Sequence, residues 1–309
     1  MTTNLLAQLT FEDEVAAHTQ RLVVQAAGVR LPELFGAGRR GLAHRTERCG
    51  VTTVAVLTRD LRPPELLDIL RFRLAQYLMA RFVDPEVIFA AGREYEPPEQ
   101  VTGDDLHILA GSAATGEILC YATLRAVEDV PPGATLLTAD RPLLPVEKTF
   151  GQGVYNGLRV LPDLPLTKLR EMGRFVKNQQ LRCPELGVRA PIEVGAAIFR
   201  MLLGTLRSDV LALVGDLEED VAKHNLDYFH APTLIVRDAA AHAMEDAYLF
   251  RHFRERECRP FAILTRDLDA SISRLDLVEQ ALSLPGRHAM LPLYRLKRDT
   301  CCTNSALAA

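Results

Sequence analysis

Apolar residues recur every three or four positions between residues 63 and 82, and this spacing predicts an amphipathic helix. Its apolar positions are Leu67, Leu70, Leu74, Leu78 and Phe82. The segment opens with two prolines, which suit the first turn of a helix because the missing N–H has no intrahelical partner there. Just before this helix, the β-branched run at 51–58 predicts a strand.

The first fifty residues have a helical pattern. Thr10 and Asp13 resemble a capping box at a helix start, Leu22 lies on an apolar stripe, and Gly28 can end the helix. The glycine- and arginine-rich stretch that follows predicts a loop. We therefore expect an N-terminal helical extension over residues 1–50.

From residue 105 onward, short apolar runs alternate with helical patterns. Strands are predicted over 107–111, 117–127, 169–177, 210–214, 232–236, 261–264 and 290–296, and helices over 191–206 and 217–225. The first two strands form a hairpin, 130–166 is a long proline-rich connection, 241–257 is helical or irregular, and 299–309 is a flexible tail. This order predicts an α/β fold, with residues 51–298 forming a mixed, mostly antiparallel central sheet with helices on both faces.

The composition is that of an ordinary globular protein. Hydrophobic residues make up 48% and charged residues 25% of the 309 positions, which is enough chain to bury a sizeable core. A net charge of −4 gives no general case for nucleic-acid binding. No apolar run is long enough to span a membrane, and acidic residues at 12–14 interrupt any signal-peptide pattern. We expect a cytoplasmic protein without a membrane span.

The six cysteines include no C-x-x-C pair and no cysteine–histidine spacing typical of zinc. Reduced thiols and no bound metal are therefore expected. Cys301 and Cys302 lie in the predicted tail, where redox or lipid attachment is one hypothesis and incidental thiols are the other.

The strongest candidate for chemistry is the predicted strand at 169–177. Strand alternation places Glu171 and Gly173 on one face and Arg174 on the other. A bulge or a splay, both common beside active sites, would bring Glu171 and Arg174 to one rim. The alternative is a surface ion pair on an edge strand.

This strand resembles a motif of the GCN5-related N-acetyltransferase superfamily, in particular of the autoinducer (acyl-homoserine lactone) synthases and the N-acyl amino acid synthases. Residues 171–176 read Glu-Met-Gly-Arg-Phe-Val, against the family pattern E-x-S-R-F-V. On the long helix, Arg73 and Tyr77 resemble R-x-x-x-F, and the Glu-Tyr-Glu at 94–96 resembles an acidic–aromatic–acidic segment.

The hairpin at 116–125 resembles G-E-V-V-G-x-A-R-L, with Thr123 at the family arginine and Arg125 as a replacement on the same strand face. The chain contains no tryptophan, which autoinducer synthases usually carry after the R-x-x-x-F helix. The resemblance covers roughly residues 51–240 and implies a fold like that of acyl-CoA N-acyltransferases.

For the acyl donor, the resemblance implies a thioester site along the strand. Backbone N–H groups of Phe175, Val176, Lys177 and Asn178 would bind the thioester carbonyl and the pantetheine arm. The family's glycine-rich phosphate loop is missing before the helix at 191, where Arg182 and Arg189 would assist instead. This absence favours an acyl carrier protein over coenzyme A as the donor. A basic segment at Arg251, Arg254, Arg256 and Arg259 would attract such a partner, or is simply a solvated helix face.

For the acceptor, the resemblance implies that Glu171 takes the amine proton while Arg174 holds a carboxylate or orients Glu171. Tyr228 stands where many members place a tyrosine that protonates the leaving thiolate. The candidates for substrate binding are Arg73, Tyr77, Glu94, Glu96 and Arg125. Their ordinary alternatives are a solvated arginine beside a core tyrosine, loop solvation for the two glutamates, and a half-buried aromatic for Tyr228.

The implied function is an N-acyltransferase that moves a fatty acyl group from a carrier-protein or coenzyme A thioester to the amine of a small amino-acid-like acceptor. A variant is an acyl-homoserine lactone synthase with S-adenosylmethionine as co-substrate, which Thr123 and the missing tryptophan disfavour. Other classes are a non-catalytic acyl-binding module and an acetyltransferase acting on a protein or polyamine. The missing phosphate loop counts against the acetyltransferase.

Overall fold

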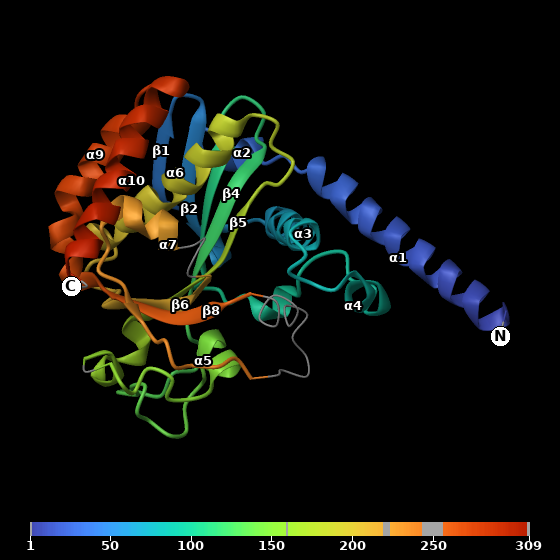
Figure 1. Ribbon diagram of the computed structural model, residues 1–309, viewed down its shortest axis with the longest axis horizontal. Coiled ribbons are helices and arrows are strands. Elements are labelled where there is room, and N and C mark those ends of the chain that lie inside the picture. Colours follow the sequence, from blue (N-terminus) through green and yellow to red (C-terminus); the bar gives the residue numbers. More distant parts are fainter. Residues whose placement is uncertain (1, 159, 219–222, 243–255, 308–309) are drawn as a thin grey trace.

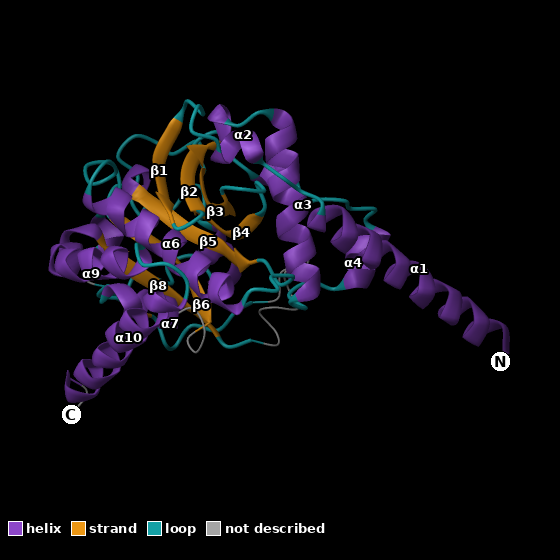
Figure 2. Cartoon of the chain, turned by 90° about the horizontal axis from the view of Figure 1, so that it is seen from above, coloured by secondary structure: helices purple, strands orange, loops and turns teal. Residues whose placement is uncertain are grey.

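The computed structural model describes residues 2–158, 160–218, 223–242 and 256–307. In these residues a single sheet of eight strands runs in the order β1-β2-β3-β4-β5-β6-β8-β7, and helices cover both of its faces (Figures 1 and 2). All neighbouring strands are antiparallel except β5 and β6. The predicted fold class, a mixed and mostly antiparallel sheet between helices, is confirmed.

The elements follow one another from an N-terminal helix into the sheet. The strands are β1 (Leu42–Arg48), β2 (Val51–Leu57), β3 (Leu106–Ser112), β4 (Ile118–Arg125), β5 (Leu169–Lys177), β6 (Ala212–Glu218), β7 (Leu234–Ile235) and β8 (Cys258–Leu264). The helices are α1 (Thr2–Ala27), α2 (Pro32–Phe35), α3 (Pro63–Met79), α4 (Pro85–Ala90), α5 (Pro145–Phe150), α6 (Pro184–Leu203), α7 (Lys223–Leu226), α9 (Ile272–Leu282) and α10 (Arg287–Leu307).

Three apolar clusters fill the space between the sheet and its helices. One packs α6, α9 and α10 against a full face of the sheet, and its centre includes Phe199 and Phe229 with ring centroids 4.7 Å apart. On the other face, α3 packs over β2–β5 and the connection containing α5 packs over β5, β6 and β8. The boundary between these last two clusters lies over β5.

Most predicted elements are confirmed, including the long helix at 63–79, the hairpin and the strand at 169–177. Helix α3 begins where expected, and the side chain of Glu65 accepts a 2.8 Å hydrogen bond from the backbone N–H of Arg62. Helix α1 ends at Ala27 before Gly28, but it begins at Thr2 rather than near Thr10.

Several expectations differ from the structure. The predicted loop before residue 51 contains β1, which pairs with β2. Helix α6 begins at Pro184, so Pro191 lies inside it, between the buried residues Ala190 and Ile192, and contributes no backbone N–H to the helix. Strand β6 continues to Glu218, where a helix was expected.

The last correction concerns the predicted strand at 290–296, which belongs to α10. Ala289 and Leu293 are buried while Leu291 and Tyr294 are exposed, and a four-residue spacing of buried positions is the period of a helix. The helix continues through residues expected to form the tail, and α9 before it was not predicted.

Strands β5 and β6 separate after three paired residues. Leu169, Arg170 and Glu171 pair with Ala212, Leu213 and Val214, and beyond these positions β5 pairs only with β4 while β6 pairs only with β8. The middle of the sheet therefore opens past Glu171, and backbone groups on the facing edges of the two strands are left without a partner strand.

Strand β5 also contains a bulge. Tyr121 of β4 faces Val176 and Thr123 faces Gly173, so β5 has one residue more than β4 over this interval. Arg174 lies within it with φ of 55°, in the left-handed region that non-glycine residues seldom occupy. The extra residue shifts the alternation by one, and it brings Arg174 to the face that Glu171 already occupies. The expected bulge is confirmed, and the edge-strand alternative is wrong because β5 is central and Glu171 is buried.

Gly215, the first residue of β6 past the last pair, is held by a tyrosine. The hydroxyl of Tyr155 accepts from the Gly215 N–H at 3.2 Å and lies 3.1 Å from the Gly215 carbonyl oxygen, to which it can donate. Gly215 has φ of 156°, and a Cβ atom there would lie 2.5 Å from the carbonyl oxygen of Met172. Only glycine fits where the two strands part.

Replacing Gly215 by alanine should destabilise the protein by about 1–3 kcal/mol, because the clash is with backbone of β5 that cannot move without unpairing it from β4. Urea unfolding measures the loss. The matched control is Gly173→Ala on β5, where a Cβ meets nothing within 4 Å. Equal stability of the two variants would contradict the close approach of β5 and β6 at this point.

Candidate active site

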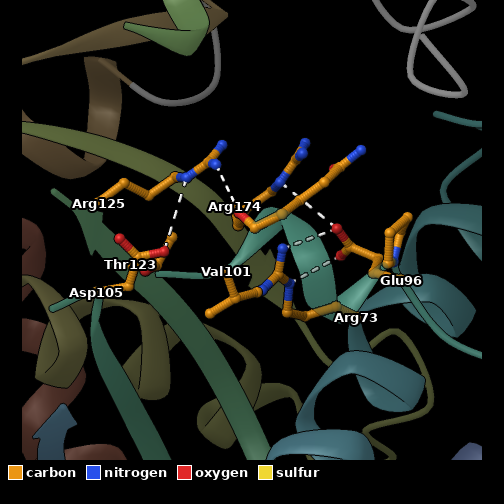
Figure 3. A pocket seen from close by; sticks show the side chains of 9 residues that line it. Arg73, Glu96, Val101, Asp105, Thr123, Arg125 and Arg174 are labelled. Carbon is orange, nitrogen blue, oxygen red and sulfur yellow. Dashed lines mark hydrogen bonds and ion pairs between the residues drawn. The ribbon is translucent and has the colours of Figure 1, made fainter. Parts of the chain in front are cut away.

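A polar pocket lies where α3, β3, β4 and β5 meet beside the opening of the sheet (Figure 3). Its lining residues are Arg73, Glu96, Pro97, Gln100, Val101, Asp105, Thr123, Arg125 and Arg174. Three guanidinium groups and two carboxylates converge there, so charges of both signs gather at one point. Four of the residues predicted from the sequence, Arg73, Glu96, Arg125 and Arg174, are brought together.

The floor of the pocket is a buried ion pair between Arg73 and Glu96. Nε and Nη2 of Arg73 each donate a 2.8 Å hydrogen bond to one carboxylate oxygen of Glu96, and the two residues are 4% and 2% exposed. The solvated-arginine alternative is therefore wrong for Arg73. Glu94, two residues earlier, is exposed and does not share this position.

Behind Arg73, a chain of hydrogen bonds fixes the third nitrogen of its guanidinium. Arg73 Nη1 donates to Tyr121 Oη at 3.3 Å, which lies 2.8 Å from Nδ1 of His107, and His107 Nε2 lies 2.9 Å from Thr58 Oγ1. Burial lowers the pKa of His107 to about 3, so the imidazole is neutral. Because Thr58 Oγ1 donates to the backbone oxygen of Asp105 at 3.2 Å, it accepts from Nε2 of His107. The neutral imidazole therefore carries its proton on Nε2, and Nδ1 accepts from the Tyr121 hydroxyl.

Arg174 extends from the bulge of β5 over the same floor. Its Nε lies 3.6 Å from Glu96 Oε2, and its guanidinium carbon lies 5.9 Å from the centre of the Tyr77 ring. Figure 3 shows Arg174 and Arg125 extending in the same direction above Glu96 and Asp105. Tyr77 is buried beneath, and its hydroxyl has no hydrogen-bond partner among the described residues.

Glu171 lies next to this pocket, as the cross-strand partner of Arg125, and is 4% exposed. One carboxylate oxygen accepts a 3.0 Å hydrogen bond from the backbone N–H of Val146, in the first turn of α5. Burial raises the pKa of Glu171 to about 8, although the guanidinium of Arg125 opposes the shift. A carboxyl group with a pKa near neutrality is suited to take up and release a proton.

A second carboxylate, Asp216, lies on the same face of the sheet as Glu171. Strand β6 alternates so that Ala212 and Val214 face the cluster over α5, and Asp216 continues that face two residues past the last pair with β5. Burial raises the pKa of Asp216 to about 6, and the charge of Arg174 opposes this rise. Sequence reasoning missed Asp216, whose only signal is an acidic residue on the inward face of an otherwise apolar strand.

Tyr228 lies away from the polar pocket. It is buried in the cluster of α6, α9 and α10, where Nζ of Lys297 lies 5.8 Å from its ring centre and Nε of Arg274 donates to its backbone oxygen at 3.1 Å. Burial raises the pKa of its hydroxyl. The structure thus does not place Tyr228 with Glu171 and Arg174.

The residues expected to hold the donor lie along β5 and the start of α6. Phe175 and Val176 pack into the clusters on opposite faces of the sheet, and Lys177 is exposed. Asn178 is buried, and its side chain donates to the backbone oxygen of Ile118 at 3.0 Å. These contacts hold the end of β5 against β4. The other edge of β5, which faces β6, is not paired with a strand past Glu171.

The two arginines near α6 differ. Arg182 is exposed just before the helix begins. Arg189 is 4% exposed, and its guanidinium donates to the backbone oxygens of Arg48, Leu282 and Leu284. The hydrogen bonds of Arg189 thus join α6 to β1 and to the end of α9. Of the basic segment, Arg251 and Arg254 lie outside the described residues.

Within the described residues, no helix is long and apolar enough to cross a membrane. The same residues contain no group of three metal-ligating side chains suited to a metal ion.

No protein-family model and no curated protein matches the sequence. Among solved structures, the chain is similar to the AHL synthase LasI, at 12% identity and a TM-score of 0.43, over 74% of this chain and 95% of LasI. TofI, crystallised with an inhibitor and MTA, is 16% identical at a TM-score of 0.42, over 72% of this chain and 96% of TofI.

FeeM, an N-acyl amino acid synthase from uncultured soil microbes, is 15% identical at a TM-score of 0.39, over 71% of this chain and 94% of FeeM. These names include both classes that the sequence motifs resemble. Because the identities and TM-scores are this low, the chemistry has to be deduced from the residues of this chain.

Replacing Glu96 by glutamine should destabilise the protein by about 3–5 kcal/mol, because Arg73 would remain buried without its counter-charge. The exposed neighbour supplies the control: Glu94→Gln should change the free energy of unfolding by less than about 0.5 kcal/mol. Thermal and urea unfolding of both variants decide this prediction, and similar stabilities would mean that Arg73 does not depend on Glu96.

Glu171 should make the protein less stable as the pH rises from about 4.5 to about 8, since the folded-state pKa is raised to about 8 from an ordinary value of 4.5. The folded state then binds the proton more tightly than the unfolded chain. This contribution is fully present below the unfolded pKa and is lost through the folded pKa, at up to about 1.4 kcal/mol per pH unit.

The measurement is the free energy of unfolding at half-unit steps from pH 4.5 to 9 for the native protein and Glu171→Gln. Glutamine keeps an oxygen that can accept from Val146 N. The stability difference between the two proteins should change steadily up to about pH 8 and then level off. A difference that does not vary with pH would show that Glu171 titrates normally.

Proposed function

We propose that this protein is an N-acyltransferase that moves a fatty acyl group from a thioester to the amine of a small amino-acid-like acceptor. The observation that carries the proposal is the buried Glu171, whose pKa is raised to about 8 by burial, beside an arginine-lined pocket at the point where β5 and β6 separate. Each part answers one requirement of acyl transfer.

The thioester would enter between β5 and β6. Past Glu171 and Val214 the facing edges of these strands lack a partner strand, and Tyr155 holds Gly215 on the β6 edge. The backbone N–H groups of the β5 edge would bind the thioester carbonyl and the amides of a pantetheine arm. The donor we propose is an acyl carrier protein, with acyl-coenzyme A as the alternative. Exposed Lys177 and Arg182 lie near the start of α6, where they would meet the phosphate of either donor.

The acceptor would occupy the pocket. Arg174 and Arg125 can bind its carboxylate, and the paired Arg73 and Glu96 hold the floor in place. Glu171, alongside Arg125, would take a proton from the amine directly or through one water as nitrogen attacks the thioester carbonyl. The C–S bond then breaks, and the leaving thiolate takes up the proton that Glu171 received, which gives a free thiol and an N-acylated acceptor.

Glu171→Gln should lower product formation at least tenfold, because a positioned general base contributes about 10²–10⁴ in rate. Lipid extracts of cells that express the native protein, Glu171→Gln or the exposed-site control Glu94→Gln are compared by mass spectrometry. N-acylated species should be present with the native protein and the control and be depleted with Glu171→Gln.

The masses identify the acceptor and the acyl chain, and a lactone product would indicate S-adenosylmethionine as the co-substrate. The same products from Glu171→Gln at undiminished yield would contradict its role as base. No product from the native protein would favour an acyl-binding module without turnover.

A further inference from the structure

We infer that Asp216 is a positioning residue of this site, which acts through Glu171 and Arg174 to keep Glu171 able to bind a proton. This inference rests on the proposed function for its catalytic meaning, but its electrostatic content can be tested without any substrate. It starts from the way that β6 presents Asp216 beside the opening of the sheet.

Two carboxylates flank the point at which β5 and β6 part. Glu171 is the last residue of β5 to pair with β6, and its partner is Val214. Asp216 is two residues further along β6 on the same face, which the cluster over α5 covers. The glycine between Val214 and Asp216 is the residue that Tyr155 holds, so the backbone around Asp216 is fixed rather than free to turn outward.

The charge of Arg174 acts on both of these acids. Arg174 is also within ion-pair distance of Glu96, at 3.6 Å. Without Asp216, a larger share of the attraction of Arg174 would fall on Glu171. Stronger pairing of Arg174 with Glu171 would favour the carboxylate form and weaken its affinity for a proton.

The remaining charged and titratable groups around the two acids come from four neighbouring elements and from Arg141 and Tyr155 of the 126–168 connection. They are Arg125 on β4, Glu147 on α5 with its ion-pair partner Arg141, Tyr155, Glu218 on β6, and Cys258 on β8 with Arg256 just before it. Arg141 neutralises Glu147, and burial keeps Tyr155 and Cys258 protonated by raising their pKa values. Asp216 is therefore the negative charge that acts on Glu171 from the facing strand.

For the reaction, this means that the two acids have different protonation states and different roles. The pKa of Asp216, raised by burial to about 6, leaves it mostly charged at neutral pH, whereas the pKa of Glu171, raised by burial to about 8, leaves that residue mostly protonated. A fixed negative charge beside a proton-binding carboxyl is the arrangement that separates the roles of two acids in one site. Asp216 holds its charge while Glu171 exchanges the proton.

The test isolates the titration of Glu171 in the presence and absence of Asp216. Unfolding free energies are measured from pH 4.5 to 9 for four proteins: the native chain, Glu171→Gln, Asp216→Asn and the double variant. The native chain minus Glu171→Gln gives the titration of Glu171 beside Asp216, and Asp216→Asn minus the double variant gives it without Asp216.

The second curve should level off at a lower pH than the first, by about one pH unit, because it levels off at the folded-state pKa of Glu171. Asp216→Glu, which keeps the charge, should restore the higher levelling pH, whereas a merely structural role would leave the two curves superimposed. If Asp216→Asn does not fold, the levelling pH for Asp216→Glu against Asp216→Ser, each with its Glu171→Gln partner, decides the same question. Superimposed curves overturn the inference.

A second readout links the result to function. With the N-acylated product found in the expression experiment, the rising limb of product formation against pH should move to lower pH in Asp216→Asn. If the unfolding curves separate but no product is found with the native protein, the proposed function fails while the pairing of Asp216 with Glu171 stands. If product forms but Asp216→Asn changes neither the unfolding curves nor the pH dependence of product formation, only the inference about Asp216 fails.

Discussion

The site depends on one constraint in the backbone: β5 and β6 begin as parallel neighbours and cannot remain so. Three pairs join them, and then the bulge at Arg174 on one strand and the glycine conformation of Gly215 on the other turn the strands apart. Each strand keeps its other neighbour, so the sheet stays continuous while its middle opens. The hydroxyl of Tyr155 accepts from the Gly215 N–H and lies within hydrogen-bond distance of the backbone oxygens of Gly215 and Phe261, so it holds β6 where β5 leaves it. Everything charged in the site is placed relative to this opening.

The charges themselves are costly to bury, and their arrangement shows how that cost is met. Arg73 and Glu96 form a two-bond pair, and the third nitrogen of Arg73 reaches Tyr121 and the neutral His107 behind it. A buried pair of this kind contributes little net stability compared with apolar packing, because desolvation offsets the attraction. The pair instead fixes the position of a carboxylate under Arg174, and so it also restricts where the Arg174 guanidinium can lie.

Much of the fold and the position of Glu171 and Arg174 could be predicted from the sequence, because they depend on patterns within short segments. The 3.6-residue period gave α3, the β-branched and alternating runs gave β2–β5, and the motif at 171–176 pointed to the bulge. The prediction of an element was wrong where tertiary packing decides between a helix and a strand for a short apolar run. Residues 290–296 suit a strand by composition, yet the burial of Ala289 and Leu293 is the pattern of a helix. Asp216, Tyr155 and His107 could not be foreseen, since each acts on residues distant in sequence through the fold alone.

The two raised pKa values also explain how a buried acid could serve as a base at neutral pH. An empty site holds Glu171 mostly protonated, because burial disfavours its charged form, and this is the less costly state while no cation is present. In the proposed reaction the acceptor would arrive as an ammonium ion, and its positive charge would favour the carboxylate form of Glu171 beside the already charged Asp216. Glu171 would then be deprotonated only when the acceptor is bound, and the ligand rather than the fold would offset the cost of a second buried carboxylate. Once the amide had formed, the positive charge would be gone and Glu171 would again be most stable as the neutral acid.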